Sequence, residues 1–179
     1  MAERDNTVQL RDPSKEKKRM REFRNSIMNV ILVILVLWIA FTFFLGLKMA
    51  PNDDMKPRIS AGDLLLYYRV DKLVDPQDIV IVKKNKTEYV GRVVATSGDK
   101  VDIGKSGLLI NDIPVSEDNI YYDTIPYEGF VEYPVTMKDD ECFVLADYRR
   151  GGEDSRYYGV VTKDEIKGTV IGQFRRAGI

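Results

Sequence analysis

The sequence predicts a mainly β domain behind a single N-terminal transmembrane helix, and two observations carry this prediction. The apolar run from Ile27 to Leu47 contains no charged residue, and it is long enough to cross roughly 30 Å of hydrocarbon as a helix. After it, short runs rich in β-branched and aromatic residues alternate with turn-forming breaks, which is typical of strands. A chain of 179 residues has room for one modest domain besides this helix.

Three regions follow one another, namely a polar tail over 1–26, the span over 27–47 and the β domain over 48–179. Basic residues crowd the tail just before the span, at Lys15, Lys17, Lys18, Arg19, Arg21 and Arg24. The positive-inside rule therefore places the N-terminus in the cytoplasm and 48–179 outside the cell membrane. The tail is also expected to attract anionic membrane lipid. Because Lys48-Met49-Ala50-Pro51 fits a signal-peptide exit poorly, we expect a retained anchor.

The expected strands of the outer region are 64–70, 79–82, 89–94, 130–137, 142–146, 158–162 and 168–174. Breaks between them fall at Asp75-Pro76, Ser97-Gly98-Asp99 and Asn111-Asp112. A single helical turn is predicted to start at Thr162, because Glu165 three residues later completes a capping box.

Composition excludes several classes of function. The chain has no histidine, which removes Ser-His-Asp hydrolysis, Cys-His proteolysis and every histidine-containing zinc site. The single cysteine, Cys142, lies in an apolar run and is expected to be a buried hydrophobe rather than a nucleophile. A formal net charge of -1 argues against nucleic-acid binding, which needs a basic surface. We expect neither a metal nor a cofactor.

Several short motifs stand in a fixed order behind the anchor. They are Asp54-Met55-Lys56-Pro57, Gly62-Asp63, Tyr89-Val90-Gly91-Arg92-Val93, Ser97-Gly98-Asp99, Ala146-Asp147-Tyr148-Arg149 and Asp154-Ser155-Arg156. In order and spacing they resemble the motifs of the type I signal peptidases, over the anchor and essentially all of 48–179. The resemblance implies an antiparallel β-sheet domain that binds the leader of an exported protein.

The departures from that family fall on its catalytic positions. The family's nucleophilic serine aligns with Asp54, its lysine general base with Gly91, and the serine of its third motif with Gly152. A hydroxyl nucleophile needs an adjacent base, and glycine has no group that accepts a proton. The resemblance therefore implies an inactive homologue, with no catalytic residue.

An alternative is a membrane signal peptidase with an unconventional site that uses Asp54. Asp53 and Asp54 are a carboxylate pair, which in aspartic proteases shares a proton. Neighbours in an extended strand point to opposite faces, however, so these two are not expected to share a water. Ser60 and Ser155 are the remaining hydroxyls near the motifs, and neither aligns with the nucleophile.

The resemblance assigns roles to the residues that remain. Met55 and Pro57 are expected to shape a groove wall, while turn and bracing roles fall to Gly62, Asp63, Asp147, Arg149, Asp154, Ser155 and Arg156. An extended peptide that adds to a strand edge needs no nucleophile. The expected peptide-binding residues are Asp53, Asp54, Met55, Pro57, Tyr89, Val90 and Gly91. Loss of the lysine side chain is expected to open space at Gly91.

Among signal-peptidase-like proteins, the pattern looks most like those encoded with pilus genes in Gram-positive bacteria. That resemblance implies an assembly factor or chaperone whose partners are pilin subunits and a pilus sortase, and it leaves the oligomeric state open. Aromatic residues also gather at Ile120-Tyr121-Tyr122, Tyr127, Phe130 and Tyr133. We expect them to pack on the sheet, with a partner site as the alternative.

Overall fold

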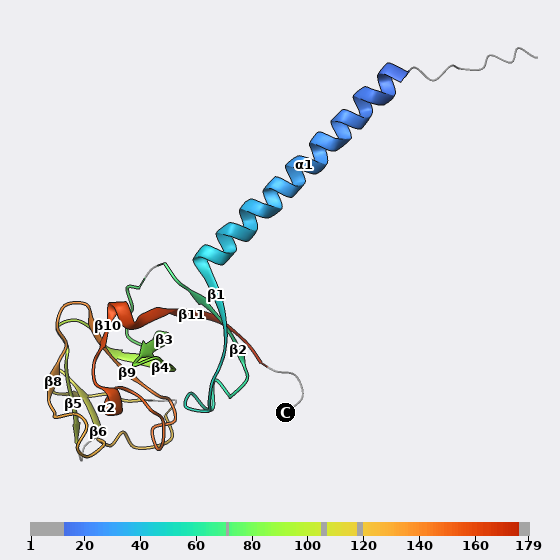
Figure 1. Cartoon of the computed structure of the whole chain (residues 1–179). Helices are drawn as coiled ribbons and strands as arrows, with labels where there is room; N and C mark the ends of the chain where they lie inside the picture. The colour runs from blue at the N-terminus through green and yellow to red at the C-terminus, as the bar shows by residue number, and fades with distance from the viewer. Residues whose placement is uncertain (1–12, 71, 105–106, 118–119, 176–179) are drawn as a thin grey trace, which may run out of the picture. The chain divides into compact units, whose positions relative to one another are not determined.

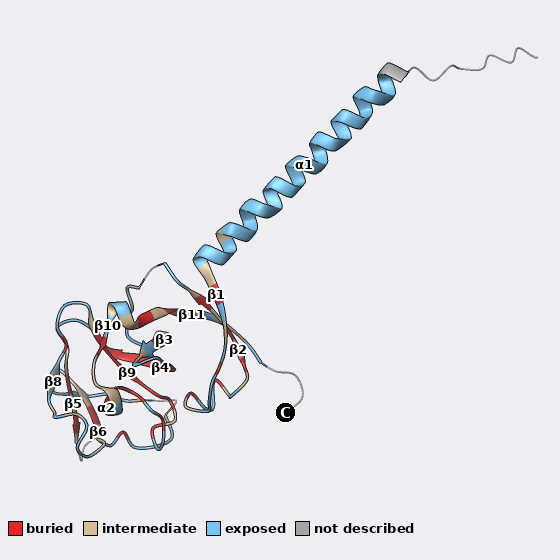
Figure 2. Ribbon diagram, in the orientation of Figure 1, coloured by how far each residue is buried: buried red, intermediate tan, exposed pale blue. Residues whose placement is uncertain are grey.

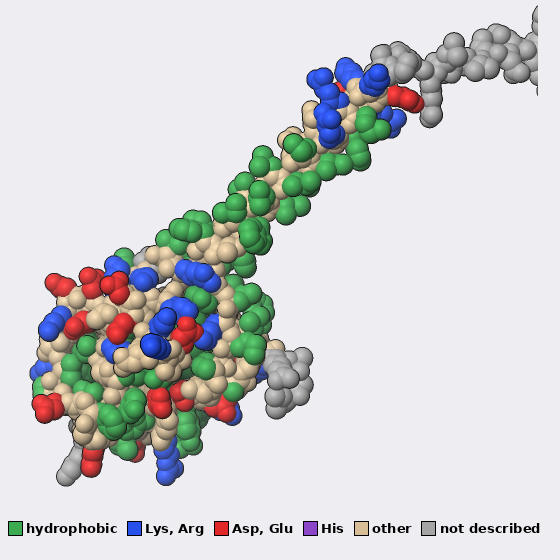
Figure 3. Space-filling view, viewed as in Figure 1, with side chains coloured by type: hydrophobic (Ala, Val, Ile, Leu, Met, Phe, Trp, Pro, Cys, Tyr) green, Lys and Arg blue, Asp and Glu red, His purple; other side chains and the backbone are tan. Residues whose placement is uncertain are grey.

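The computed structural model describes residues 13–70, 72–104, 107–117 and 120–175. The first of its two units ends at Thr42 and contains most of the helix α1 (Pro13–Phe44). Within the described ranges α1 is the only helix long and apolar enough to cross a membrane. Figure 3 shows hydrophobic side chains along its middle and basic ones at its N-terminal end. The helix takes in residues 13–26 of the expected tail, because Lys, Arg and Glu are good helix formers. It ends at Phe44, and residues 45–47 of the expected span belong to a strand.

The second unit, residues 43–179, contains two antiparallel sheets in the described part of the chain (Figure 1). The larger sheet has seven strands in the order β1-β2-β11-β3-β4-β9-β10. Its strands are β1 (Leu45–Met49), β2 (Leu64–Tyr68), β3 (Ile79–Lys84), β4 (Thr87–Ala95), β9 (Glu141–Leu145), β10 (Val161–Thr162) and β11 (Ile166–Phe174). The smaller sheet has the order β7-β6-β5-β8. Its strands are β5 (Lys100–Gly104), β6 (Gly107–Ile110), β7 (Ile113–Pro114) and β8 (Val135–Thr136).

The mainly β prediction is confirmed, with differences in detail. Two expected strands are reduced to the two-residue pieces β8 and β10, and β1, β5, β6 and β7 were not expected. The helical turn after Thr162 forms as the 3₁₀ helix η1 (Lys163–Glu165), where the Thr162 N–H donates to Glu165 Oε2 at 2.9 Å. A further single turn, α2 (Ser155–Tyr158), was not predicted. Its cap is Asp154, which accepts a hydrogen bond from the Arg156 N–H.

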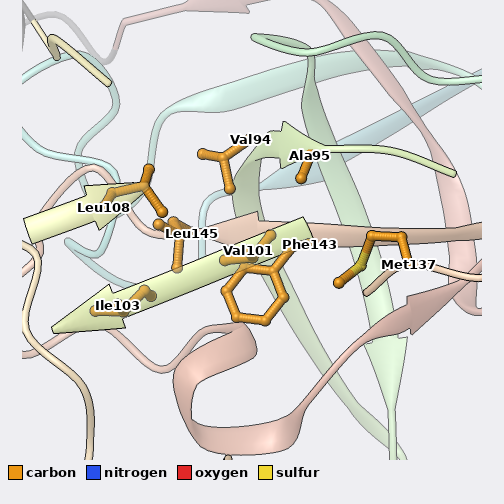
Figure 4. Packing of buried hydrophobic residues seen from close by; sticks show 8 residues of the cluster. All are labelled: Val94, Ala95, Val101, Ile103, Leu108, Met137, Phe143 and Leu145. Atoms are coloured by element: carbon orange, nitrogen blue, oxygen red, sulfur yellow. The ribbon is translucent and has the colours of Figure 1, made fainter. Parts of the chain in front are cut away.

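Buried apolar residues form three clusters, and burial concentrates on the strands (Figure 2). One cluster lies where strands of the two sheets face each other, and Figure 4 shows its side chains converging: Val94, Ala95, Val101, Ile103, Leu108, Met137, Phe143 and Leu145. A second contains Ala50, Met55, Ile59, Leu65, Tyr67, Ile81 and Val90. A third contains Val80, Val82, Val93, Cys142, Val144, Val161 and Ile166. Cys142 is buried as expected, and burial raises the pKa of its thiol to about 12.

Candidate functional site

Asp54 lies in the turn that follows β1, not in a strand as the sequence suggested. Its carbonyl accepts a hydrogen bond from the Tyr148 N–H at 2.7 Å, and its Oδ2 accepts one from Asn52 Nδ2 at 2.7 Å. The next residue, Met55, is buried and anchors this turn in the second apolar cluster. The Asp147 N–H also contacts Met55 Sδ at 3.4 Å. Pro57 is exposed, and both Met55 and Pro57 belong to the turn that presents Asp54.

Asp53 and Asp54 have separate partners. Asp53 Oδ1 accepts from the Ala61 N–H at 2.9 Å, and Oδ2 forms an ion pair with Lys56 at 2.9 Å. The Ala61 N–H and Lys56 lower the pKa of Asp53, whereas burial raises the pKa of Asp54. The expectation that these carboxylates do not form a shared acid–base pair agrees with their contacts. The reason given for it was wrong, because the two residues do not lie in an extended strand.

Gly91 lies inside the seven-stranded sheet, in β4 between β3 and β9, where it pairs with Val80 of β3. A Cβ built on Gly91 would lie 2.5 Å from Val144 Cγ1 and 3.2 Å from the Leu145 carbonyl oxygen. Real Cβ atoms essentially never approach another heavy atom as closely as the first of these distances. The expectation of open space at Gly91 is therefore wrong, because the Val144 side chain lies too close to the position from which a lysine would extend.

Gly152 is buried directly beside Asp54. A Cβ on Gly152 would lie 3.5 Å from Asp54 Cβ, and it would overlap the methyl group of Ala146. The Gly152 carbonyl accepts a hydrogen bond from the Tyr127 hydroxyl at 2.9 Å. The fold thus brings together Asp54 and Gly152, two of the three degenerate positions, and leaves no room for a side chain at either glycine.

Two buried ion pairs brace the site from behind. Arg92 donates through Nε to Asp147 Oδ1 at 2.8 Å and through Nη2 to Asp147 Oδ2 at 2.5 Å. Arg156 binds Asp154 in the same bidentate manner, at 2.9 Å and 2.7 Å. Asp154 also accepts from the Ala146 N–H, at 3.0 Å. Bidentate arginine–carboxylate pairs fix the orientation of both side chains. Because Asp147 and Asp154 lie on either side of Gly152 in the sequence, the two pairs hold the segment that carries Gly152.

The other residues with an expected structural role are also buried or hydrogen-bonded. Ser155 Oγ accepts from the Val144 N–H at 3.0 Å. The Asp63 carboxylate accepts from the Ser60 N–H at 3.0 Å and from Gln173 Nε2 at 2.6 Å. Gly62 precedes it with φ +86, a conformation that L side chains rarely adopt. Asp63 is therefore held at the base of the turn that presents Asp54.

The β4 residues before Gly91 divide between core and surface. The Val90 side chain is buried in the second apolar cluster, so Val90 can meet a bound peptide only through its main chain. Tyr89 is half-buried against Tyr158, with ring centroids 4.8 Å apart. Pairing of β4 with β9 begins only at Arg92, and among the described strands none pairs with Thr87–Val90 on that side. This stretch of main chain is the part of β4 that an added strand could reach.

Several residues that form the site were not predicted from the sequence to be part of it. Val144 fills the space beside Gly91, Tyr148 binds the Asp54 carbonyl, Asn52 binds its carboxylate, and Tyr127 binds the Gly152 carbonyl. Except for Asn52, each is separated from its partner by many residues in the sequence. Motif spacing carries no signal for such contacts, because the register between distant strands decides them.

Similarity to known proteins identifies the family. The family model described as "Signal peptidase, peptidase S26" matches residues 23–174. "Signal peptidase I S" of Bacillus subtilis is 30% identical over 86% of this chain and 88% of its own length. "Inactive signal peptidase IA" of Staphylococcus aureus is 23% identical over 84% and 91%.

A signal peptidase I structure from Enterococcus faecalis matches 56% of this chain and 98% of its own, at 23% identity and a TM-score of 0.45. The relatives include both proteins named as signal peptidases and proteins named as inactive. From the match over residues 23–174, this chain belongs to the signal peptidase family S26.

Proposed function

We propose that this chain is a non-catalytic, signal-peptidase-like assembly factor that binds extended segments of pilin subunits and supports sortase-dependent pilus polymerisation in a Gram-positive bacterium. The observation that carries the loss of catalysis is the filled position at Gly91. Val144 Cγ1 lies only 2.5 Å from where the first atom of a lysine side chain would be, so the site lacks both the base and the space for it. Loss of a nucleophile–base unit costs on the order of a million-fold in rate.

Peptide binding requires less of the site than catalysis does. Thr87–Val90 of β4 has main-chain groups on the β9 side that no described strand pairs. An extended segment can add there through main-chain hydrogen bonds. Tyr89 and Asp54 lie close enough to Glu153 for that carboxylate to perturb the pKa values of both. The bound segment would therefore pass acidic side chains as well as apolar ones.

The anchor supports a role at the cell surface. The basic residues of α1 precede its apolar part, and by the positive-inside rule this order supports a cytoplasmic N-terminus and a β domain outside. A single-pass protein in this orientation meets secreted subunits close to membrane enzymes. Tethering raises the effective concentration of partners without tight binding, which suits a factor that passes pilins to a sortase.

A membrane peptidase that uses Asp54 is the second candidate. It is favoured by one observation, the half-buried Asp54 carboxyl whose pKa is raised by burial. Asp53 is turned toward Lys56 and Ala61, so Asp54 would have to act without Asp53 as its partner. As a nucleophile, Asp54 would form an anhydride with the substrate acyl group, which is a poor intermediate for peptide cleavage.

The test uses the full chain in non-ionic detergent with a pilin precursor that still carries its leader. Intact-mass spectrometry follows cleavage, and co-purification on the tagged chain follows binding. Wild type and Asp54→Ala are compared, with a working signal peptidase as the positive control for cleavage. We expect the precursor to stay intact and to co-purify with both proteins, because binding does not depend on a nucleophile.

Two results would contradict the proposal in different ways. A specific cut made by the wild type and lost in Asp54→Ala would identify an unconventional peptidase. An intact precursor that fails to co-purify with either protein would remove pilin binding. In cells that assemble pili, a gene deletion should abolish the polymer, and Asp54→Ala should still restore it, with at most a gradual loss, because Asp54 is expected to contact the peptide but not to cut it.

A further inference from the structure

The connection between β7 and β8 exposes large apolar side chains, and one of them, Phe130, packs against Tyr157 of α2. Tyr121 is 79% exposed and Phe130 57% exposed, and the remaining members of this aromatic surface are Tyr122, Ile125 and Tyr157. The expectation that these aromatics pack on the sheet holds for Tyr133, which contacts Phe143. It is wrong for Tyr121, Tyr122 and Phe130. The sequence pattern could not show this, because the connection has few strand residues to set an inward face.

Buried contacts hold the aromatic surface in place. Arg149 is fully buried, and its guanidinium donates to Thr124 Oγ1 at 2.9 Å and to Glu117. Arg156 Nη1 donates to the Ile125 carbonyl at 3.2 Å, and its guanidinium lies 4.4 Å from the centre of the Tyr127 ring. The exposed aromatics therefore stand on a segment that is fixed before any partner arrives. Such preorganisation lowers the entropy lost on binding.

The aromatic surface adjoins the candidate site. Tyr122 meets Tyr148 edge to face, with ring centroids 5.3 Å apart, and the Tyr148 N–H donates to the Asp54 carbonyl at 2.7 Å. On the other side of the surface, the ring centroid of Phe130 lies 4.7 Å from that of Tyr157 in α2. Tyr148 thus contacts both Asp54 and the Tyr122 end of the aromatic surface.

The charges of this connection have one sign. Residues 115–136 contain Glu117, Asp118, Asp123, Glu128 and Glu132, and neither lysine nor arginine. Glu117 is neutralised by Arg149, whereas Asp123, Glu128 and Glu132 are exposed. Arg150 lies over the Tyr122 ring at 5.9 Å, at the border of the surface. Exposed aromatic rings attract cations through their faces, and the neighbouring carboxylates attract them through their negative charge.

We propose that the aromatic surface docks a lysine-rich extended segment of a secreted partner protein. This proposal rests on the proposed binding function and adds the chemistry of the bound segment to it. The lysine ammonium groups would meet the exposed carboxylates, and the side-chain stems would lie on the rings. An anionic lipid surface is disfavoured because those carboxylates would repel it. Docking here would set the direction in which a partner segment approaches Asp54.

The test measures the fluorescence anisotropy of labelled peptides with the full chain in non-ionic detergent, and empty micelles serve as the blank. One peptide repeats Lys-Val-Thr and its counterpart repeats Gln-Val-Thr. The lysine peptide should bind more tightly, and added salt should weaken its binding. Tyr121→Ala and Phe130→Ala should each weaken it by about tenfold, as truncation of an aromatic hot spot does. Glu128→Gln should reduce the salt dependence.

A matched control separates this surface from exposed apolar area in general. Phe174 of β11 is 58% exposed, almost the same as Phe130, so Phe174→Ala should leave binding unchanged. Equal binding of both peptides, unaffected by Tyr121→Ala and Phe130→Ala, would overturn this inference and leave peptide binding elsewhere intact. Binding of neither peptide, together with a precursor that fails to co-purify, would overturn both proposals. Circular dichroism should show all variants folded, since the replaced side chains are exposed.

Discussion

The filled position at Gly91 makes a direct prediction about Gly91→Ala. A single added methyl group would lie 2.5 Å from Val144 Cγ1 and 3.2 Å from the Leu145 carbonyl oxygen. The first contact forces Val144 to move, and the second presses on the backbone of β9. Both neighbours are completely buried, so neither can relieve the overlap by turning into solvent.

Overpacking of this kind costs about 1–3 kcal/mol. For a domain of this size each kcal/mol lowers the melting temperature by about 3–5 °C. Val144→Ala alone should cost about 2 kcal/mol, because it removes buried methyl groups and leaves a cavity. In the double variant the methyl group added at position 91 enters that cavity. The loss of stability should then fall short of the sum of the single losses by about 1–2 kcal/mol.

The assay is chemical denaturation of the full chain in detergent, followed by circular dichroism at a wavelength that reports the β domain. The free energies of unfolding of wild type, both single variants and the double variant complete the cycle. If Gly91→Ala were as stable as wild type, or the two losses simply added, Val144 would not occupy the position. A lysine could then be restored at position 91, and the physical argument for lost catalysis would fail.

Three further predictions concern charged groups. Asp147→Ala should destabilise the fold by about 3–5 kcal/mol, because it leaves the buried Arg92 guanidinium without its carboxylate; Asp147→Asn should cost less in the same unfolding assay, since the amide keeps one hydrogen bond. Lys167 and Lys48 lower the pKa of Glu88 from 4.5 to about 2, so its contribution to stability is present above pH 4.5 and is lost as pH falls toward 2. Glu88→Gln should remove that part of the loss in melting curves recorded across this range, and an unchanged pH profile would contradict the ion-pair cluster. Asp54 has the opposite sign: burial raises its pKa above 3.8, so the folded state loses stability as pH rises from 3.8 through the raised value. Asp54→Asn should flatten that slope and be more stable than wild type at neutral pH, whereas a variant with the wild-type slope would show that the carboxyl is not desolvated.

Some errors of sequence-based prediction have a common cause. The sequence placed Asp54 in a strand and left open space at Gly91. In the structure Asp54 lies in a turn, and the Val144 side chain closes the space at Gly91. The second outcome depends on which side chain of β9 faces β4. A motif names a residue and its order along the chain, but it does not name the side chain that faces it across the sheet.

By itself the sequence determined the apolar helix, the mainly β character of the domain behind it and the family, and the resemblance aligned Asp54 and Gly91 with the family's serine and lysine. These features depend on local composition, run length and motif order, which need no tertiary contact. Only the tertiary structure decided that Val144 fills the space at Gly91, that Gly152 lies against Asp54, and that Tyr121 and Phe130 stay exposed. The register of β4 on β9, with its irregularity between Val93 and Ala95, sets the first of these contacts. Register is a property of two distant strands packed together, so no single segment of the sequence encodes it.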